Sequence, residues 1–184
     1  MSKASDTRLP KTVDPYRLAE HDTVLEGDVP LSALSRFRNA VMGFEDDAVC
    51  RVKLSFYLDG ERRRTVSGEL EAPVSLQCQR CMESMGTVLT SSFLLGLVTS
   101  DGQARQLPKE LEPFLMDEFN ADLWLMVEDE LLLALPSYPV HDRSECPAKE
   151  ELEAYEPDGS SEGSEEGTAD NPFSVLAGLK KTKH

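Results

Sequence analysis

Residues 49–58 read Val49-Cys50-Arg51-Val52-Lys53-Leu54-Ser55-Phe56-Tyr57-Leu58, and an apolar side chain stands at every second position. This repeat of two predicts a strand that buries one face and exposes the other. Cys50 falls on the buried side, so we interpret it as a small core residue and leave it out of any metal site. Asp59-Gly60 then predicts a hairpin turn, because glycine adopts positive φ without steric cost, and residues 62–70 supply the return strand.

Two further strands are predicted downstream. The first, residues 74–77, begins after Pro73 and is short. The second, residues 86–98, is unusually long, and Gly96 within it is expected to make a bulge or a bend. Residues 48–98 are therefore predicted to form an antiparallel meander.

A helical period appears on both sides of this meander. Before it, apolar residues recur every three or four positions in residues 31–41, which predicts an amphipathic helix. After it, residues 122–134 predict a second helix, which Asn120 or Asp122 caps and Pro136 ends. The residues expected on the core face of the second helix are Leu123, Met126, Val127 and Leu131.

Three consecutive acids interrupt the second helix. We interpret Glu128, Asp129 and Glu130 as a solvated face, because runs of charge usually lie in water. A catalytic role for these carboxylates needs a neighbouring base or nucleophile, and the segment offers neither.

Composition divides the chain into four parts. Residues 1–8 are polar and predict a flexible N-terminus. Residues 9–146 predict a single α+β domain, an antiparallel β-meander packed by two or more helices, with a short edge strand near residues 23–27. Residues 147–170 are rich in glutamate, glycine, serine and aspartate, which predicts a disordered acidic linker. Residues 171–184 are apolar and then basic, and we expect a docking segment there.

Charge limits the classes of partner. The 184 residues carry a formal net charge of −15, and broad contact with nucleic acid requires an excess of lysine and arginine. A local patch for RNA contact is left as an alternative, formed by Arg62, Arg63, Arg64 and Arg80. An acidic surface suits a basic partner, such as a ribosomal protein, or serves solubility alone.

The sequence predicts a soluble, cytoplasmic protein without membrane contact. It contains no uninterrupted apolar run of about 18 residues, and no apolar run follows a basic start. Its four cysteines are unevenly spaced, which favours free thiols over a disulfide framework.

Cys78-Gln79-Arg80-Cys81 offers two thiols to one metal ion from a tight turn. A tetrahedral site needs two more ligands, and His141 and Cys146 are the best candidates, so the four residues would make a Cys3His site suited to zinc. The alternative is that these are ordinary reduced cysteines and that the protein has no cofactor. A thioredoxin-like redox pair is disfavoured, because no βαβ pattern surrounds the motif.

The C-terminal segment combines apolar and basic residues. After Pro172, a short helix can present apolar side chains at a spacing of three on one side. Such a segment is either a docking peptide for a partner or a strap onto its own domain. The candidate partner-binding residues are Phe173, Val175, Leu176, Leu179, Lys180 and Lys181.

Four separated motifs together resemble the bacterial large ribosomal RNA subunit accumulation protein family, YceD. They are Leu76-Gln77-Cys78-Gln79-Arg80-Cys81-Met82-Glu83, Met126-Val127-Glu128-Asp129-Glu130-Leu131-Leu132-Leu133-Ala134-Leu135-Pro136, Val140-His141-Asp142 and Asn171-Pro172-Phe173-Ser174-Val175-Leu176-Ala177-Gly178-Leu179-Lys180. The resemblance extends from the region of Leu9-Pro10 to the C-terminus. It implies a cytoplasmic protein needed for the synthesis, processing or stability of 23S rRNA, and it supplies no catalytic residues. Some relatives in the wider family carry further cysteine pairs downstream, where this chain has only His141 and Cys146.

Two classes of function follow from these observations. The first is a non-enzymatic ribosome-biogenesis factor that binds a ribosomal protein, 23S rRNA or a precursor of the large subunit, with no small-molecule substrate. The second is an RNA-processing enzyme or nuclease that acts on pre-rRNA. Against the second, the three histidines are scattered and the sequence has no glycine-rich phosphate loop.

Overall fold

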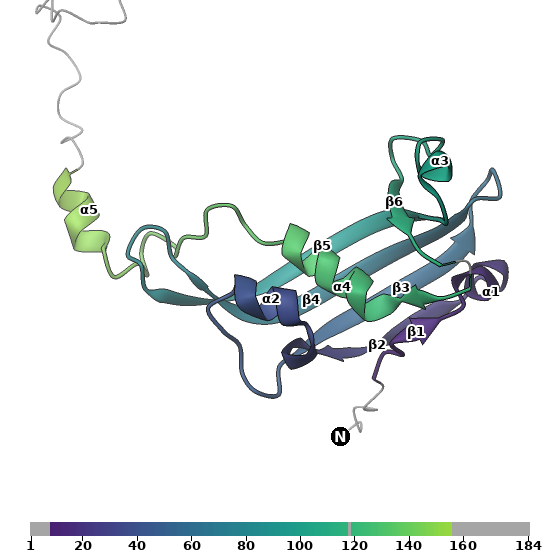
Figure 1. The fold of residues 1–184 in the computed structure, drawn as a ribbon. Helices are drawn as coiled ribbons and strands as arrows, with labels where there is room; N and C mark the ends of the chain where they lie inside the picture. Colours follow the sequence, from purple (N-terminus) through teal and green to yellow (C-terminus); the bar gives the residue numbers. More distant parts are fainter. Residues whose placement is uncertain (1–7, 118, 156–184) are drawn as a thin grey trace, which may run out of the picture. The chain divides into compact units, whose positions relative to one another are not determined.

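The computed structural model describes residues 8–117 and 119–155 (Figure 1). Among these residues, five strands form the main sheet in the order β2-β3-β4-β5-β6. The strands are β2 Val24–Pro30, β3 Val49–Leu58, β4 Arg64–Gln77, β5 Ser84–Val98 and β6 Glu112–Leu115. Strands β2 to β5 pair antiparallel, and β6 pairs parallel to β5. The predicted α+β class with an antiparallel meander is confirmed.

The alternating pattern of β3 produces the buried face expected from it. Cys50, Val52, Leu54 and Phe56 lie in the core, whereas Arg51 and the other intervening residues are exposed or half-buried. Burial raises the pKa of the Cys50 thiol to about 12, as expected for a cysteine that serves only packing.

Strand β4 corrects the prediction of two strands separated at Pro73. It is continuous, and it pairs with β5 from Thr65↔Gly96 to Gln77↔Ser84. Proline is tolerated here because the pairing of β4 with β3 ends at Arg51↔Glu71, so Pro73 has no β3 ladder to join. Beyond Glu71, β4 and β5 continue together as an arm, and Ser75 of β4 exchanges backbone hydrogen bonds with Met42 and Gly43 on the other side.

The strand registers exclude a bulge at Gly96. The register between β4 and β5 advances one residue at a time up to Gly96, and the register between β5 and β6 does so from Leu95 to Val98. The alternative prediction of a bend stays a prediction. Glycine is needed for a different reason, because a Cβ atom there would lie 2.7 Å from Leu107 Cδ1. Gly68 has a similar role, since the ring of its cross-strand neighbour Phe93 occupies the space of the missing side chain.

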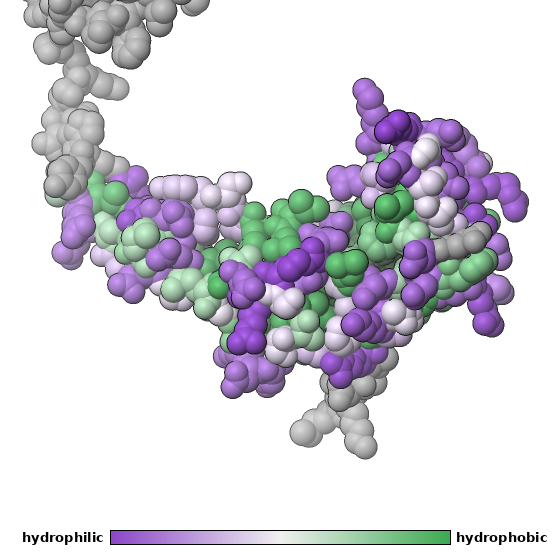
Figure 2. Space-filling view, in the orientation of Figure 1, coloured by the Kyte–Doolittle hydropathy of each residue, from purple (hydrophilic) through white to green (hydrophobic). Residues whose placement is uncertain are grey.

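The two predicted helices are present on one face of the sheet (Figure 1). Helix α4 spans Leu123–Leu133, and its four predicted core residues are all buried. Asp122 caps it by accepting hydrogen bonds from the N–H groups of Trp124 and Leu125. The first predicted helix divides at Leu34 into the 3-10 turn η1 Leu31–Ala33 and helix α2 Ser35–Ala40. Figure 2 shows hydrophobic residues gathered around α4 on this side, where Leu125 and Leu133 are exposed.

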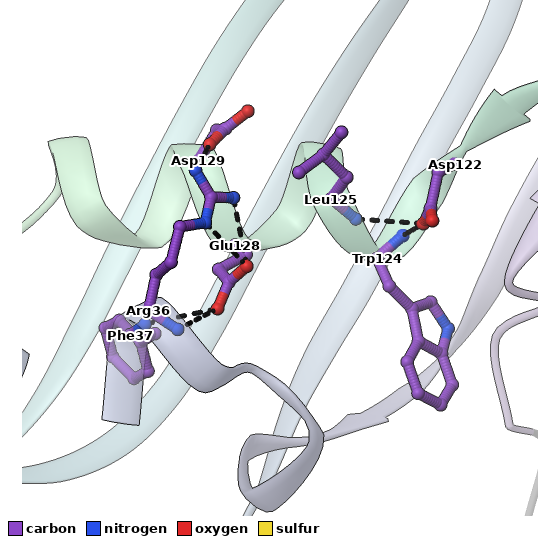
Figure 3. A network of polar contacts seen from close by, with 7 residues as sticks. All are labelled: Arg36, Phe37, Asp122, Trp124, Leu125, Glu128 and Asp129. Atoms are coloured by element: carbon purple, nitrogen blue, oxygen red, sulfur yellow. Dashed lines mark hydrogen bonds and ion pairs between the residues drawn. The ribbon is translucent and has the colours of Figure 1, made fainter. Parts of the chain in front are cut away.

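The run of three acids in α4 is not the solvated face expected from the sequence. Glu128 and Glu130 are each only 7% exposed. Glu128 Oε1 accepts hydrogen bonds from the N–H groups of Arg36 and Phe37, at 2.6 and 3.2 Å, and so caps α2 from a distant part of the chain. Its second oxygen accepts from Arg36 Nε at 3.0 Å, and Arg36 also contacts Asp129 (Figure 3). We refer to these contacts as the Glu128 junction.

Smaller elements complete the part of the chain before residue 148. Strand β1 Thr12–Val13 pairs with β7 Ala121–Asp122 in a separate two-stranded sheet. Helix α1 Pro15–Glu20 follows β1, and helix α3 Asp101–Ala104 follows β5.

A second compact unit begins at Ala148. Its described part contains helix α5 Lys149–Tyr155, in which Lys149 and Glu153 lie 3.9 Å apart. The sequence predicts a disordered linker over residues 147–170, and helix α5 lies in the first part of that range. Spacing of opposite charges by four residues favours the helix locally. The rest of the predicted linker and the segment 171–184 lie outside the described residues.

Candidate metal centre

The arm formed by β4 and β5 ends in a tight turn over residues 78–83. The turn is closed by hydrogen bonds from Cys78 N to Glu83 O and from Met82 N to Cys78 O, both 2.9 Å. Met82 adopts a positive φ of 63°, which lets the chain reverse and places Cys78 and Cys81 on the same side. The turn therefore presents two sulfurs to one point, as expected from the Cys-x-x-Cys spacing.

The segment after α4 lies against this turn. Gln79 N donates to Pro139 O at 2.8 Å, and Tyr138 OH lies 3.5 Å from Gln79 O. His141 N points at Cys78 Sγ at 3.5 Å. These three contacts hold the segment against the turn.

The four predicted ligands come together. Cys81 Sγ lies 3.4 Å from His141 Nδ1, and the ligand atoms of Cys78, Cys81, His141 and Cys146 all lie within 4.8 Å of one another. We call these residues the Cys3His cluster. In a tetrahedral zinc site with Zn–S bonds of about 2.3 Å, sulfur atoms lie about 3.8 Å apart. The cluster thus fits a zinc ion with shifts of about 1 Å or less.

Hydrogen bonding and burial give the sulfurs different acidities. Burial alone would raise the pKa of the Cys78 thiol, but the backbone N–H groups of Cys81, His141 and Arg80 outweigh it and lower the pKa to about 5. Burial raises the pKa of Cys81, and the nearby sulfurs of Cys78 and Cys146 raise it further. A cation between these sulfurs would reverse that repulsion, because metal binding favours the thiolate.

Burial is typical of a structural site. Cys78 and Cys146 are buried, and Cys81 and His141 are half-buried. With three thiolates and one imidazole, the protein would supply all four ligands of a tetrahedral ion, which would leave no coordination position open for a substrate. Cys50 lies in the sheet core and is not part of the cluster, as predicted.

The four arginines proposed for RNA contact do not lie together. Arg62, Arg63 and Arg64 stand at the β3–β4 hairpin, and Arg80 stands at the opposite end of β4, about 40 Å away along the strand. Arg63 is bound to Asp59 at 2.6 Å. A single patch of four arginines is therefore excluded by the geometry, and RNA contact by any of them stays a prediction.

Other sequence predictions concern parts that the structure does not describe. The candidate partner-binding residues Phe173, Val175, Leu176, Leu179, Lys180 and Lys181 lie outside the described residues. Among the helices of residues 8–117 and 119–155, none combines the length and apolar character needed to cross a membrane.

Sequence reasoning missed the support around the ligands. The contact from Gln79 N to Pro139 O uses only backbone atoms, so no side-chain motif indicates it. One signal was available, because Pro136 and Pro139 on either side of Tyr138 predict an extended segment that can lie along another strand end.

Comparison with known proteins agrees with the arrangement of motifs. A family model described as "Large ribosomal RNA subunit accumulation protein YceD" matches residues 66–180, which include all four residues of the cluster. A protein of Haemophilus influenzae with the same description is 37% identical over 177 residues, covering 95% of this chain and 97% of that protein. No solved structure matches the chain.

Proposed function

Because the chain belongs to the large ribosomal RNA subunit accumulation protein family, YceD, we propose that it is a ribosome-biogenesis factor that supports the synthesis, processing or stability of 23S rRNA. The observation that carries this proposal is the match over 95% of the chain to a relative with that name. It acts before or during formation of the large subunit, and cells that lack it accumulate less of that subunit.

The protein works by binding and not by turnover. Two groups of reactive side chains support this: Glu128 accepts the backbone N–H groups of α2, and the Cys3His cluster would supply all four ligands of a metal ion. A catalytic zinc site normally keeps a position open for water or substrate. The partner is a ribosomal protein, 23S rRNA or a precursor of the large subunit.

Zinc is the metal that suits the cluster. Three sulfurs and one imidazole nitrogen in a compact group favour zinc over harder cations, which prefer oxygen ligands. The ion fixes the segment containing His141 and Cys146 against the arm of β4 and β5. It therefore fixes the conformation of the residues just before Ala148, where the second unit begins.

The C-terminal segment provides a second contact with the same particle. Phe173, Leu176 and Leu179 serve as apolar anchors, and Lys180 and Lys181 add charge. The match to the family model extends to residue 180, so this segment is included in the matched region. Two linked contacts raise avidity by a factor of about 10² to 10⁴ when both reach one particle.

Depletion of the protein from growing cells tests the proposed function. We expect the ratio of 50S to 30S subunits and the amount of mature 23S rRNA to fall, and a plasmid copy to restore both. Purified protein should bind precursor particles without shortening or modifying rRNA fragments. Normal subunit ratios after depletion would refute the role, and cleavage or modification of rRNA would show that the protein is an RNA-processing enzyme.

A further inference from the structure

The face of the sheet opposite α2 and α4 carries rows of polar side chains. The strand registers align Asp28, Arg51, Glu71 and Thr90 across β2, β3, β4 and β5. Because Cys50 is buried in the core, its neighbour Arg51 points to the opposite face, and the aligned residues point there with it. Four strands at about 4.8 Å spacing make this row about 14 Å long.

A second row runs beside the first. It consists of Glu26, Lys53, Glu69 and Ser92, each two residues from a member of the first row on the same strand. Two residues of strand correspond to about 6.7 Å, so the rows stand apart by roughly the width of an extended polypeptide.

The space between the rows is a groove that crosses the strands. Its floor is the backbone of Gly27, Val52, Leu70 and Ser91, which lie between the two rows in the register. Both rows and this floor line one open cavity of about 740 Å³. We call it the cross-strand groove.

The groove has an excess of negative charge. Each row places an acid on β2, a base on β3, an acid on β4 and a hydroxyl on β5. Arg51 pairs with Glu71 at 3.0 Å, and Lys53 pairs with Glu26 at 3.3 Å. Within the described residues, Asp28 and Glu69 have no ion pair of their own. The groove therefore presents two uncompensated carboxylates, one in each wall.

We infer that the cross-strand groove binds an extended basic segment of a protein partner, with arginine or lysine side chains three residues apart. The acids of β2 and β4 are two strand spacings apart, about 9.6 Å, and three residues of extended chain span about 10 Å. The hydroxyls of Thr90 and Ser92 on β5 complete the polar walls. Phosphate groups would meet the same uncompensated carboxylates and be repelled. This inference rests on the proposed function and names the chemistry of its partner.

The test uses a synthetic nonapeptide with two arginines three positions apart in a glycine and serine background. NMR chemical-shift titration at low salt should move the signals of β2 to β5 around the groove. The double variant Asp28→Asn, Glu69→Gln should weaken binding between about twofold and thirtyfold, as two exposed charge pairs allow. The matched control Asp46→Asn, Asp101→Asn changes the net charge equally at exposed acids outside the groove, and it should leave the affinity unchanged.

Several outcomes would overturn the inference. Equal weakening by both double variants would show attraction to net charge alone. Unchanged affinity in the groove variant would exclude the groove. Tighter binding of an RNA nonanucleotide, or shifts that depend on protein concentration without peptide, would assign this face to RNA or to a second copy of the chain.

Measurements in cells separate this inference from the proposed function. If depletion of the protein lowers large-subunit levels but the groove variant restores them fully, the proposed function stands and the groove is not the partner site. If depletion itself has no effect on the large subunit, the proposed function fails. We expect the groove variant to restore large-subunit levels only in part.

Discussion

Two junctions join parts of this molecule that are far apart in the sequence, and they are completed in different ways. At the Glu128 junction, a carboxylate of α4 accepts backbone N–H groups of residues 91 and 92 positions away, so donors and acceptor all belong to the protein. At the Cys3His cluster, sulfurs 60 and more positions from His141 converge on a point where a cation would bind. The Glu128 junction is thus complete with protein groups alone, whereas we expect a metal ion to complete the Cys3His cluster.

The largest effect should come from removing one ligand of the cluster. Cys146→Ser should weaken zinc binding at least about 100-fold, because a tetrahedral site loses a thiolate. Zinc affinity is measured by competition with a chromophoric chelator. Hydrogen exchange should become faster in residues 137–146 and stay slow in β3 and β4.

Cys50→Ala is the matched control for this experiment. It also removes a cysteine, but from the sheet core, so it should keep one equivalent of zinc. Chelation of the wild-type protein should leave the sheet folded. Global unfolding on chelation would contradict the contrast between the two junctions, because the centre of the fold would then also depend on the ion.

Breaking the Glu128 junction should have the next largest effect. Glu128→Ala leaves the N–H groups of Arg36 and Phe37 without their acceptor in a buried site, and we expect the free energy of unfolding to fall by about 2–4 kcal/mol. Glu128→Gln keeps an acceptor and should cost less. Urea denaturation measures both.

Asp129→Asn serves as the control for the junction. It removes only the half-exposed contact with Arg36, which should be worth less than about 1 kcal/mol. If Glu128→Ala proves as mild as Asp129→Asn, the carboxylate does not hold α2 and α4 together, and the junction is weaker than its geometry indicates.

Glu130 is a second buried carboxylate, two residues after Glu128, and it differs from Glu128 in its effect on stability. Burial, followed by repulsion from Glu112 and Asp129, raises the pKa of Glu130 from 4.5 to about 7. The folded state therefore binds more protons than the unfolded state between these values, and stability falls as pH rises through this window. Glu130→Gln should be more stable than the wild type at pH 8, by at most about 3 kcal/mol.

Thermal unfolding across pH 4 to 8 measures the effect of Glu130→Gln. The difference between variant and wild type should shrink towards pH 4, below the unfolded-state pKa of 4.5, where the wild-type side chain is mostly protonated in both states. A difference that is constant with pH would show that packing, and not charge, separates the two proteins.

The smallest effect on stability should come from the C-terminal segment, which we expect to contribute to neither junction. If the segment binds a partner and not its own domain, deletion of residues 171–184 should shift the melting temperature by no more than about 1 °C, while association with large-subunit precursors falls. Sucrose-gradient sedimentation of cell extracts measures that association. Destabilisation by several kcal/mol would show instead that the segment is a strap on its own domain.

Local sequence patterns predicted those strands and helices in which buried and exposed positions alternate regularly along the chain. The period of two in residues 49–58 predicted β3 and its buried face, and the apolar stripe from Leu123 to Leu131 predicted α4 and its core residues. The grouping of Cys78, Cys81, His141 and Cys146 was also predicted, because cysteine and histidine are uncommon residues that can share one metal ion. In each case the residue type indicates its surroundings: apolar residues indicate the core, and cysteine with histidine indicates the cluster.

The errors arise where a distant segment decides the environment. Adjacent residues of an α-helix point about 100° apart, so three acids in a row span 200° and cannot all face water when the helix lies on a sheet. Which of them turns inward depends on α2, some 90 residues earlier. In the same way, Pro73 continues a strand because β3 stops pairing before it, and nothing near Pro73 indicates this.

The separation between the halves of the Cys3His cluster sets the order of events during synthesis. Cys81 precedes His141 by 60 residues, which at about 5–20 residues per second is a delay of roughly 3–12 s. During that time the arm of β4 and β5 can already pair, whereas its thiols have no complete set of ligands. Metal capture would therefore be a late step that follows assembly of the sheet. A shortage of zinc would then leave nascent chains with a paired sheet and with the segment of His141 and Cys146 not fixed to the turn.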